Sequence, residues 1–240
     1  MGRNSVLEIL KSGRPVNKIM LAKGQRSGPL REITGLARQR AIIVQEVDIR
    51  KLDMLAGGNG HQGVAAMVAP VAYAELEDIL ARAGDRPPFL VLLDELEDPH
   101  NLGAILRTAD AAGVNGVLIP KRRSCPLTTA VAKTSAGAIE YVPVARIGNV
   151  SQLLANLKKQ GLWIIGADMA GDREYYNLDL TGPLLLVIGN EGRGLARLTK
   201  ENCDFLVRIP MAGKINSLNA SVAGSLLMYE VFRQREMKYK

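Results

Sequence analysis

The stretch "FLVLLDELEDPHNLGAILRTADAAG", residues 89–113, has the pattern of a strand over 89–95, a polar loop, and a helix over 101–113 that Asn101 is placed to cap. Further apolar runs follow it, at 116–120, 141–144, 162–168, 184–189 and 205–210. Helical patterns separate these runs, at 126–136, 149–160, 194–201 and 217–237. Near-continuous apolar strands that alternate with helices predict an α/β fold with a parallel sheet covered on both faces.

The first part of the chain predicts a smaller α/β unit on one small sheet. Its strand candidates are short apolar runs, at 16–22, 41–47 and 64–69. Helical patterns lie between them, and we expect Asn4 to cap the first helix and Asp48 to cap another.

A change of composition marks the boundary between the two parts. A short acidic helix runs into Pro87 and Pro88, and two prolines in series stiffen a chain and cannot continue a helix. We therefore predict a small domain over 1–71, a linker over 72–87 and a larger domain over 88–240.

The net charge of the chain, +7 over 240 residues, is unevenly distributed. Residues 1–71 hold 11 Lys and Arg against 5 Asp and Glu, so most of the positive excess lies there. A basic domain joined to a nearly neutral one favours a polyanion as the partner of the first, although ordinary surface charge would give the same count.

Membrane, secreted and metal-binding classes of protein receive no support from the sequence. No apolar run approaches the about 20 residues that span a bilayer, and the N-terminal segment does not have the pattern of a secretory signal. The two cysteines, Cys125 and Cys203, have neither a disulfide framework nor metal-ligand spacing. We expect a cytoplasmic protein that uses no metal.

Three loops of the larger domain have unusual chemistry, and each follows an apolar strand, where ligands of parallel sheets bind. The middle loop, "IGNEGRGL" at 188–195, is rich in glycine, which permits close approach of the backbone to a ligand. It has neither a dinucleotide-binding glycine fingerprint nor a P-loop lysine, which disfavours a nucleotide-dependent Rossmann enzyme. A tight strand-to-helix turn is the alternative interpretation.

The other two loops carry more polar groups than their elements need. Arg107 stands on an otherwise apolar helix, where it would either pair with Asp110 or hold a phosphate or an oxyanion. The third loop, 209–221, ends in a stretch with several capping residues, although one is sufficient for a helix. These residues are Asn216, Ser217, Asn219 and Ser221.

Taken together, the three loops resemble the motifs of the SpoU (TrmH-type) branch of the SPOUT RNA methyltransferases. The motif N-x-G-x-x-x-R is matched by Asn101, Gly103 and Arg107. The motif G-x-E-G-x-G is matched by Gly189, Glu191, Gly192 and Gly194. The motif I-P-M-x-G, then S-L-N-x-S, is matched by Ile209, Pro210, Met211, Gly213, Ser217, Leu218, Asn219 and Ser221.

The first domain resembles the L30e-like substrate-binding domain that bacterial members of this family carry. Its segments "GRNSVLEIL" and "HQGVAAMV" look like the opening and closing parts of that domain. The layout of both domains is most similar to the 23S rRNA guanosine-2′-O-methyltransferase subgroup.

The resemblance implies that the protein binds S-adenosylmethionine in a C-terminal trefoil knot of the larger domain. Residue by residue, the expected cofactor contacts come from Gly189, Ile209 and Leu218. Three neighbours complete the predicted cofactor set, namely Asn190, Gly192 and Met211.

The resemblance also implies methyl transfer to a ribose 2′-hydroxyl of RNA, without a metal. A ribose hydroxyl is barely ionised at neutral pH, so the site must stabilise its alkoxide. Arg107 is expected to do so as a cation, because arginine stays protonated in proteins. Ser217 and Asn219 would orient the reacting groups, and Asn101 and Glu191 would support the loops.

A guanosine of 23S rRNA is the favoured target, bound by the basic domain and the catalytic cleft, and a homodimer is expected. Arg107 would then act on the cofactor of its own subunit or of the neighbouring one. A tRNA, or an rRNA adenosine as in resistance enzymes, is the alternative target. A non-catalytic RNA-binding factor for ribosome assembly is the alternative of another class.

Overall fold

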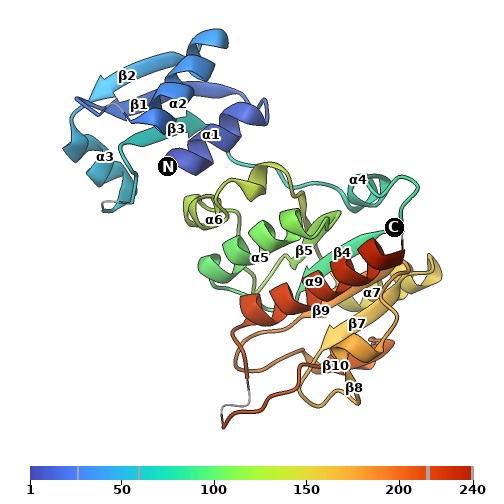
Figure 1. Ribbon diagram of the computed structural model, residues 1–240. Helices are drawn as coiled ribbons and strands as arrows, with labels where there is room; N and C mark the ends of the chain where they lie inside the picture. The colour runs from blue at the N-terminus through green and yellow to red at the C-terminus, as the bar shows by residue number, and fades with distance from the viewer. Residues whose placement is uncertain (26, 59, 215–216, 239–240) are drawn as a thin grey trace. The chain divides into compact units, whose positions relative to one another are not determined.

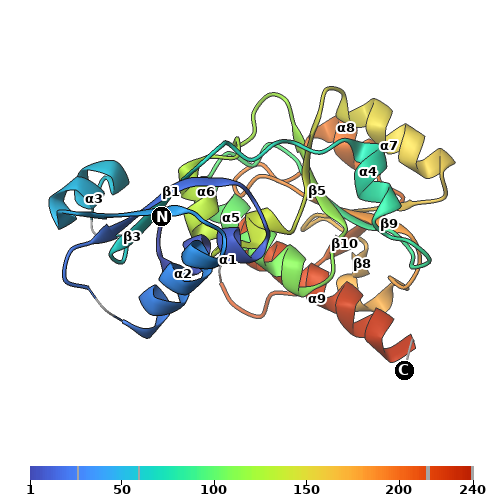
Figure 2. The same ribbon diagram turned by 90° about the horizontal axis from the view of Figure 1, so that it is seen from above.

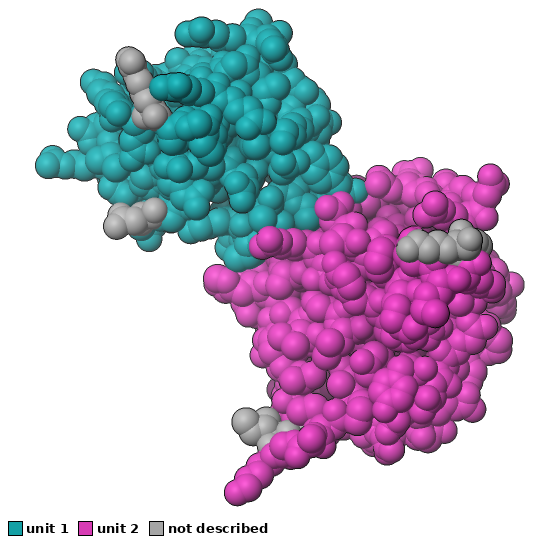
Figure 3. All heavy atoms as spheres, viewed as in Figure 1, with its two compact units in different colours: residues 1–72, 127–141 teal, residues 73–126, 142–240 magenta. Residues whose placement is uncertain are grey.

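The computed structural model describes residues 1–25, 27–58, 60–214 and 217–238, and the chain divides into two compact units (Figure 3). Unit 1 comprises Met1–Ala72 and Leu127–Tyr141, and unit 2 comprises Tyr73–Pro126 and Val142–Lys240. Asn216, predicted as one of the capping residues, lies outside the described residues.

Unit 1 is a small sheet with helices packed against it, as predicted (Figure 1). Its strand order is β2-β1-β3, with β1 (Val16–Ala22) parallel to β2 (Ile43–Val47) and antiparallel to β3 (Val64–Val68). The helices are α1 (Arg3–Lys11), α2 (Gly28–Gln39) and α3 (Ile49–Ala56).

Of the two helix caps predicted in unit 1, one is confirmed and the other is wrong. Asp48 caps α3, because its side chain accepts a hydrogen bond from the Arg50 backbone N–H. The prediction for Asn4 is wrong: α1 begins at Arg3 with Gly2 as its N-cap, so Asn4 lies inside the helix.

Residues 127–141 belong to unit 1, although the sequence analysis assigned their range to the second domain. They form α6 (Thr129–Thr134) and the 3₁₀ turn η1 (Ala138–Glu140). Glu140 accepts from Arg14 at 2.6 Å, and the Tyr141 hydroxyl donates to Glu8 at 2.7 Å. Unit 1 therefore includes a segment that lies, along the chain, between two strands of unit 2.

Unit 2 contains a seven-stranded sheet of order β6-β5-β4-β9-β7-β10-β8, and its paired strands all run parallel, as predicted. The strands are β4 (Phe89–Leu93), β5 (Gly116–Pro120), β6 (Val144–Ile147), β7 (Trp163–Ala167), β8 (Arg173–Glu174), β9 (Leu184–Ile188) and β10 (Phe205–Arg208). The strand predicted over 141–144 corresponds to β6, which begins only at Val144, and β8, which is only 2 residues long, was not predicted.

Helices cover both faces of this sheet, as Figures 1 and 2 show. They are α4 (Leu76–Ala81), α5 (Pro99–Ala111), α7 (Val150–Lys159), α8 (Arg197–Glu201) and α9 (Ala220–Lys238), with the 3₁₀ turn η2 (Tyr175–Asn177). On one face, Ile79 of α4 and Leu154 of α7 join a buried cluster with the strands. On the other, α5 and α9 lie side by side, and the Thr108 and Ser225 hydroxyls are hydrogen-bonded at 2.9 Å.

The segment predicted as a linker thus contributes to the core of unit 2, because Ile79 is fully buried in that cluster. Within the described part of the chain, no helix is long and apolar enough to cross a membrane.

Candidate functional site

A cavity of about 390 Å³ lies where strands β7, β9 and β10 end, at their common carboxyl edge. Apolar side chains form much of its wall, among them Ile188 and Val207. The six residues predicted to bind a cofactor all line it: Gly189, Asn190, Gly192, Ile209, Met211 and Leu218. Glu191 and Ser217, predicted for catalysis, line it as well. The second and third loops therefore meet around one hollow.

The glycine-rich loop is a tight turn that closes on itself. The Asn190 and Gly194 backbones exchange hydrogen bonds of 3.0 and 2.8 Å, and Gly194 has a φ of +66°. The Asn190 side chain fixes both sides of the turn, accepting from the Gly192 N–H at 2.9 Å and donating to the Glu95 carbonyl at 3.0 Å. The sequence is compatible with a tight turn or a ligand-binding loop, and the structure has a tight turn that also lines the cavity.

Gly189 is required by close packing within that turn. A Cβ built on Gly189 would lie 2.3 Å from the Gly194 carbonyl carbon, which is backbone and cannot yield easily. Gly192 has no such neighbour, since its nearest atom would be the Asn190 side-chain oxygen at 3.7 Å.

A cluster of amides around one carboxylate joins the first loop to the other two. Asn101 Nδ2 donates to Glu191 Oε1 at 2.7 Å, and Asn219 Nδ2 donates to the same oxygen and to Asn101 Oδ1 at 3.0 Å. The Ala220 backbone N–H, at the start of α9, points to that carboxylate at 3.4 Å. Asn101 is only 5% exposed, so its amide is satisfied by this cluster rather than by water.

The prediction that Asn101 caps its helix is wrong. The N-cap of α5 is Asp98, whose side chain accepts from the His100 N–H, and Pro99 occupies the first helical position. A proline is favoured there because its missing N–H needs no partner. Asn101 therefore lies within the first turn, where its side chain is free for the cluster.

Asn219 caps α9 as well as joining the cluster. Its Oδ1 accepts from the backbone N–H groups of Ser221 at 2.9 Å and Val222 at 3.3 Å. The abundance of polar residues before this helix is thus explained in part: one caps the helix and binds Glu191, while Ser217 lines the cavity.

Arg107 is not among the residues that line this cavity. It lies on α5 with its side chain exposed. Among the described residues, its side chain forms no hydrogen bond and no ion pair, so the pairing with Asp110 considered from the sequence is not made.

Three charged residues of the cavity wall were not predicted as site residues, namely Asp168, Arg193 and Lys200. Asp168 follows β7 directly, and Lys200 of α8 forms an ion pair with its Oδ2 at 2.6 Å. The sequence does contain a signal for Asp168, because it is a carboxylate at the carboxyl end of a buried strand, where parallel sheets bind ligands.

The wall suits a nucleoside-sized organic ligand, because it combines apolar side chains with a few convergent polar groups. In the described ranges, no group of three or more His, Cys, Asp or Glu side chains is arranged to hold a metal ion.

Comparison with known sequences agrees with the motifs. Residues 88–229 match the SpoU rRNA Methylase family, and residues 1–74 match the RNA 2′-O ribose methyltransferase substrate-binding family. The chain belongs to the SpoU (TrmH) family of RNA methyltransferases. YacO of Bacillus subtilis strain 168, assigned to the TrmH family of tRNA/rRNA methyltransferases, is 51% identical over 98% of this chain and 95% of its own length. A Staphylococcus saprophyticus protein with the same assignment is 50% identical over the same shares.

Solved structures of SpoU-family proteins share the fold. The SpoU methyltransferase AviRb of Streptomyces viridochromogenes, crystallised with its cofactor AdoMet, aligns with a TM-score of 0.80 and 26% identity over 99% of this chain and 90% of that one. An RNA 2′-O ribose methyltransferase aligns with a TM-score of 0.83 and 26% identity over 98% and 87%. Both likenesses extend over the two units described above.

Proposed function

We propose that this protein transfers a methyl group from S-adenosylmethionine to a ribose 2′-hydroxyl of RNA, with a guanosine of 23S rRNA as the favoured target. The observation that carries the proposal is the meeting of the three motif loops. Two of them line one cavity, and the third reaches it through the Asn101–Glu191–Asn219 cluster. Residence in the cytoplasm is part of the same proposal.

The cavity fits the adenosyl cofactor in size and in chemistry. Its volume of about 390 Å³ falls within the range of pockets that bind small organic ligands. The apolar side chains of Ile209 and Leu218 would hold the adenine, and the turn at Gly189 forms another part of the wall around it. When bound, the cofactor supplies a methyl group already activated by a positive sulfur.

The residues of the chain must then prepare the hydroxyl and hold the loops in place. A guanidinium beside the hydroxyl lowers the energy of the alkoxide and grips the adjacent phosphate, and Arg107 is our candidate for this role. Glu191 fixes the relative positions of Asn101 and Asn219, because one of its oxygens accepts from both amides. Ser217, on the cavity wall, is suited to orient the sugar.

A homodimer is part of the proposal, because Arg107 is exposed and outside the cavity wall of its own chain. Helix α9 exposes apolar side chains at helical spacing, namely Val222, Leu226 and Tyr229, each between 41 and 49% exposed. Pairing of two chains through this stripe would bury it, and Arg107 of one chain would serve the cavity of the other.

The basic domain would contact RNA phosphates, and the family match of residues 1–74 supports this role. Transfer RNA is the second candidate substrate, since the relatives are assigned to a family of tRNA/rRNA methyltransferases.

A deletion strain tests the function and separates the two substrates. Mapping of 2′-O-methyl sites should show one guanosine of 23S rRNA unmethylated, and the gene should restore it. A missing site in tRNA would replace the rRNA assignment, and complete methylation of both RNAs in the deletion strain would contradict the proposal.

A further inference from the structure

Asp168 and Lys200 are charged groups of the cavity that belong to none of the three motifs. The Asp168 side chain is only 8% exposed, against 35% for its partner Lys200, and both residues line the cavity. The carboxylate packs against the glycine-rich turn, with Oδ2 3.5 Å from where a Cβ of Gly194 would stand.

The carboxylate of Asp168 is held by two partners. Oδ1 accepts from the Ala170 backbone N–H at 3.0 Å, and Oδ2 accepts from Lys200 Nζ at 2.6 Å. A carboxylate has about four acceptor positions, so these two partners leave capacity for further hydrogen bonds. Because Lys200 balances its charge, a neutral hydroxyl is a better additional donor than an ammonium group, which would have to compete with Lys200.

Strand β7, which Asp168 follows, is separated by β9 from β4, the strand that precedes helix α5. Arg107, our candidate for stabilising the alkoxide, lies on α5. A ligand that reaches both positions would present a non-reacting part to Asp168.

We propose that Asp168, positioned by Lys200, accepts hydrogen bonds from the ribose hydroxyls of the bound adenosyl cofactor. This inference rests on the proposed function, because it concerns the same cavity. It assigns recognition of the cofactor's sugar to a carboxylate outside the motifs.

Calorimetric binding to the full-length protein tests this assignment without turnover. The probes are S-adenosylhomocysteine, 5′-methylthioadenosine, which lacks the amino-acid end, and the 2′,3′-dideoxy form of the latter, which lacks the hydroxyls. Hydrogen bonds to a charged group support a loss of about ten- to a hundredfold, so the unmodified protein should prefer methylthioadenosine to its dideoxy form by about that factor.

Asp168→Asn should weaken both hydroxyl-bearing probes by about tenfold or more and abolish the preference for the hydroxyls. Lys200→Met should reduce the same preference, because the carboxylate would lose its anchor. Asp172→Asn is the matched control: an exposed carboxylate four residues on and outside this cavity, it should leave all three affinities unchanged.

Two results would overturn the inference alone. One is loss of S-adenosylhomocysteine affinity with unchanged methylthioadenosine affinity in Asp168→Asn, which would assign the carboxylate to the amino-acid end. The other is equal binding of methylthioadenosine and its dideoxy form by the unmodified protein, a comparison that needs no variant to fold. Failure of the unmodified protein to bind S-adenosylhomocysteine would instead remove the proposed function, and this inference with it.

Discussion

At the scale of single residues, Gly189 occupies a position of the cavity wall that leaves no space for a side chain. Replacing it with alanine forces a methyl group against the Gly194 backbone, so the turn must open. We expect Gly189→Ala to lower the free energy of unfolding by about 1–3 kcal/mol. Its affinity for S-adenosylhomocysteine should fall more than about tenfold, since the wall is displaced.

Gly192→Ala is the control for this change, because its new methyl group would meet no atom closer than 3.7 Å. Urea unfolding should find its stability close to that of the unmodified protein. Equal effects of the two substitutions would show that packing within the turn does not shape the cavity.

For Arg107 we expect an effect on methyl transfer and not on cofactor affinity, because its side chain is exposed and does not line the cavity. Arg107→Ala should reduce methyl transfer by about a hundredfold or more, as removal of a group that stabilises a developing negative charge does. Affinity for S-adenosylhomocysteine should stay within about twofold, since no cavity contact is lost. Turnover within about tenfold of normal would remove Arg107 from its catalytic role.

Mixed dimers would show which chain supplies the arginine. One subunit would carry Arg107→Ala and the other Gly189→Ala. Recovery of activity in the mixture, absent from either variant alone, is expected if Arg107 acts across the dimer.

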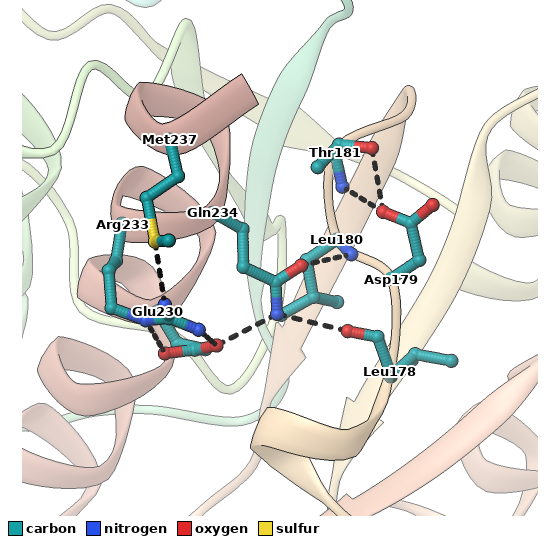
Figure 4. A network of polar contacts seen from close by, with 8 residues as sticks. All are labelled: Leu178, Asp179, Leu180, Thr181, Glu230, Arg233, Gln234 and Met237. Atoms are coloured by element: carbon teal, nitrogen blue, oxygen red, sulfur yellow. Dashed lines mark hydrogen bonds and ion pairs between the residues drawn. The ribbon is translucent and has the colours of Figure 1, made fainter. Parts of the chain in front are cut away.

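At the scale of elements, α9 is attached to the loop before β9 by a polar network (Figure 4). The Gln234 side chain accepts from the Leu180 N–H at 2.8 Å and donates to the Leu178 carbonyl at 3.0 Å and to Glu230 at 2.8 Å. Arg233 also donates to Glu230, at 2.7 and 2.9 Å. A single carboxylate, 8% exposed, therefore supports the helix that begins at the candidate site.

This network predicts a pH dependence of stability. The hydrogen bond from Arg233 holds the pKa of Glu230 below its ordinary value, although burial acts in the opposite direction. A depressed carboxyl pKa stabilises the fold above the pKa of the unfolded chain, about 4.5, and this contribution is lost as the pH falls through the folded value.

Glu230→Gln should therefore lower the free energy of unfolding by about 1 kcal/mol at pH 7, and the difference from the unmodified protein should shrink toward pH 3. Glu236→Gln, an exposed glutamate on the same helix, should show no comparable difference. Urea unfolding at both pH values measures this, and a Glu230→Gln effect that is constant across the range would contradict the assignment.

At the scale of the whole molecule, we expect the proposed dimer to form through the exposed stripe of α9. Leu226→Glu would place a charge in the middle of that stripe, so sedimentation should show a dimer for the unmodified protein and a monomer for this variant. Met54→Glu, a substitution at a more exposed apolar residue of unit 1, should leave the dimer intact. A dimer that survives Leu226→Glu would place the interface elsewhere.

Local patterns predicted the parallel sheet, because each buried strand is a run of consecutive apolar residues, and the resemblance to the family motifs predicted which residues line the candidate cavity. Asn101 was misplaced as a cap because its role depends on Glu191 and Asn219, far away in the chain. Likewise, the segment 127–141 has an ordinary helical pattern, and only tertiary contacts assign it to unit 1. The trefoil knot, the L30e-like identity of the first domain and the roles of the site residues stay predictions.

The most direct test of the account is methyl transfer by the purified protein from radiolabelled S-adenosylmethionine to 23S rRNA that lacks modifications, followed by identification of the labelled nucleoside. We expect a 2′-O-methylated guanosine at one position and loss of label with Arg107→Ala. A label on a base, or no transfer to RNA, would contradict a site in which three strand-end loops bring a methyl donor to a sugar hydroxyl.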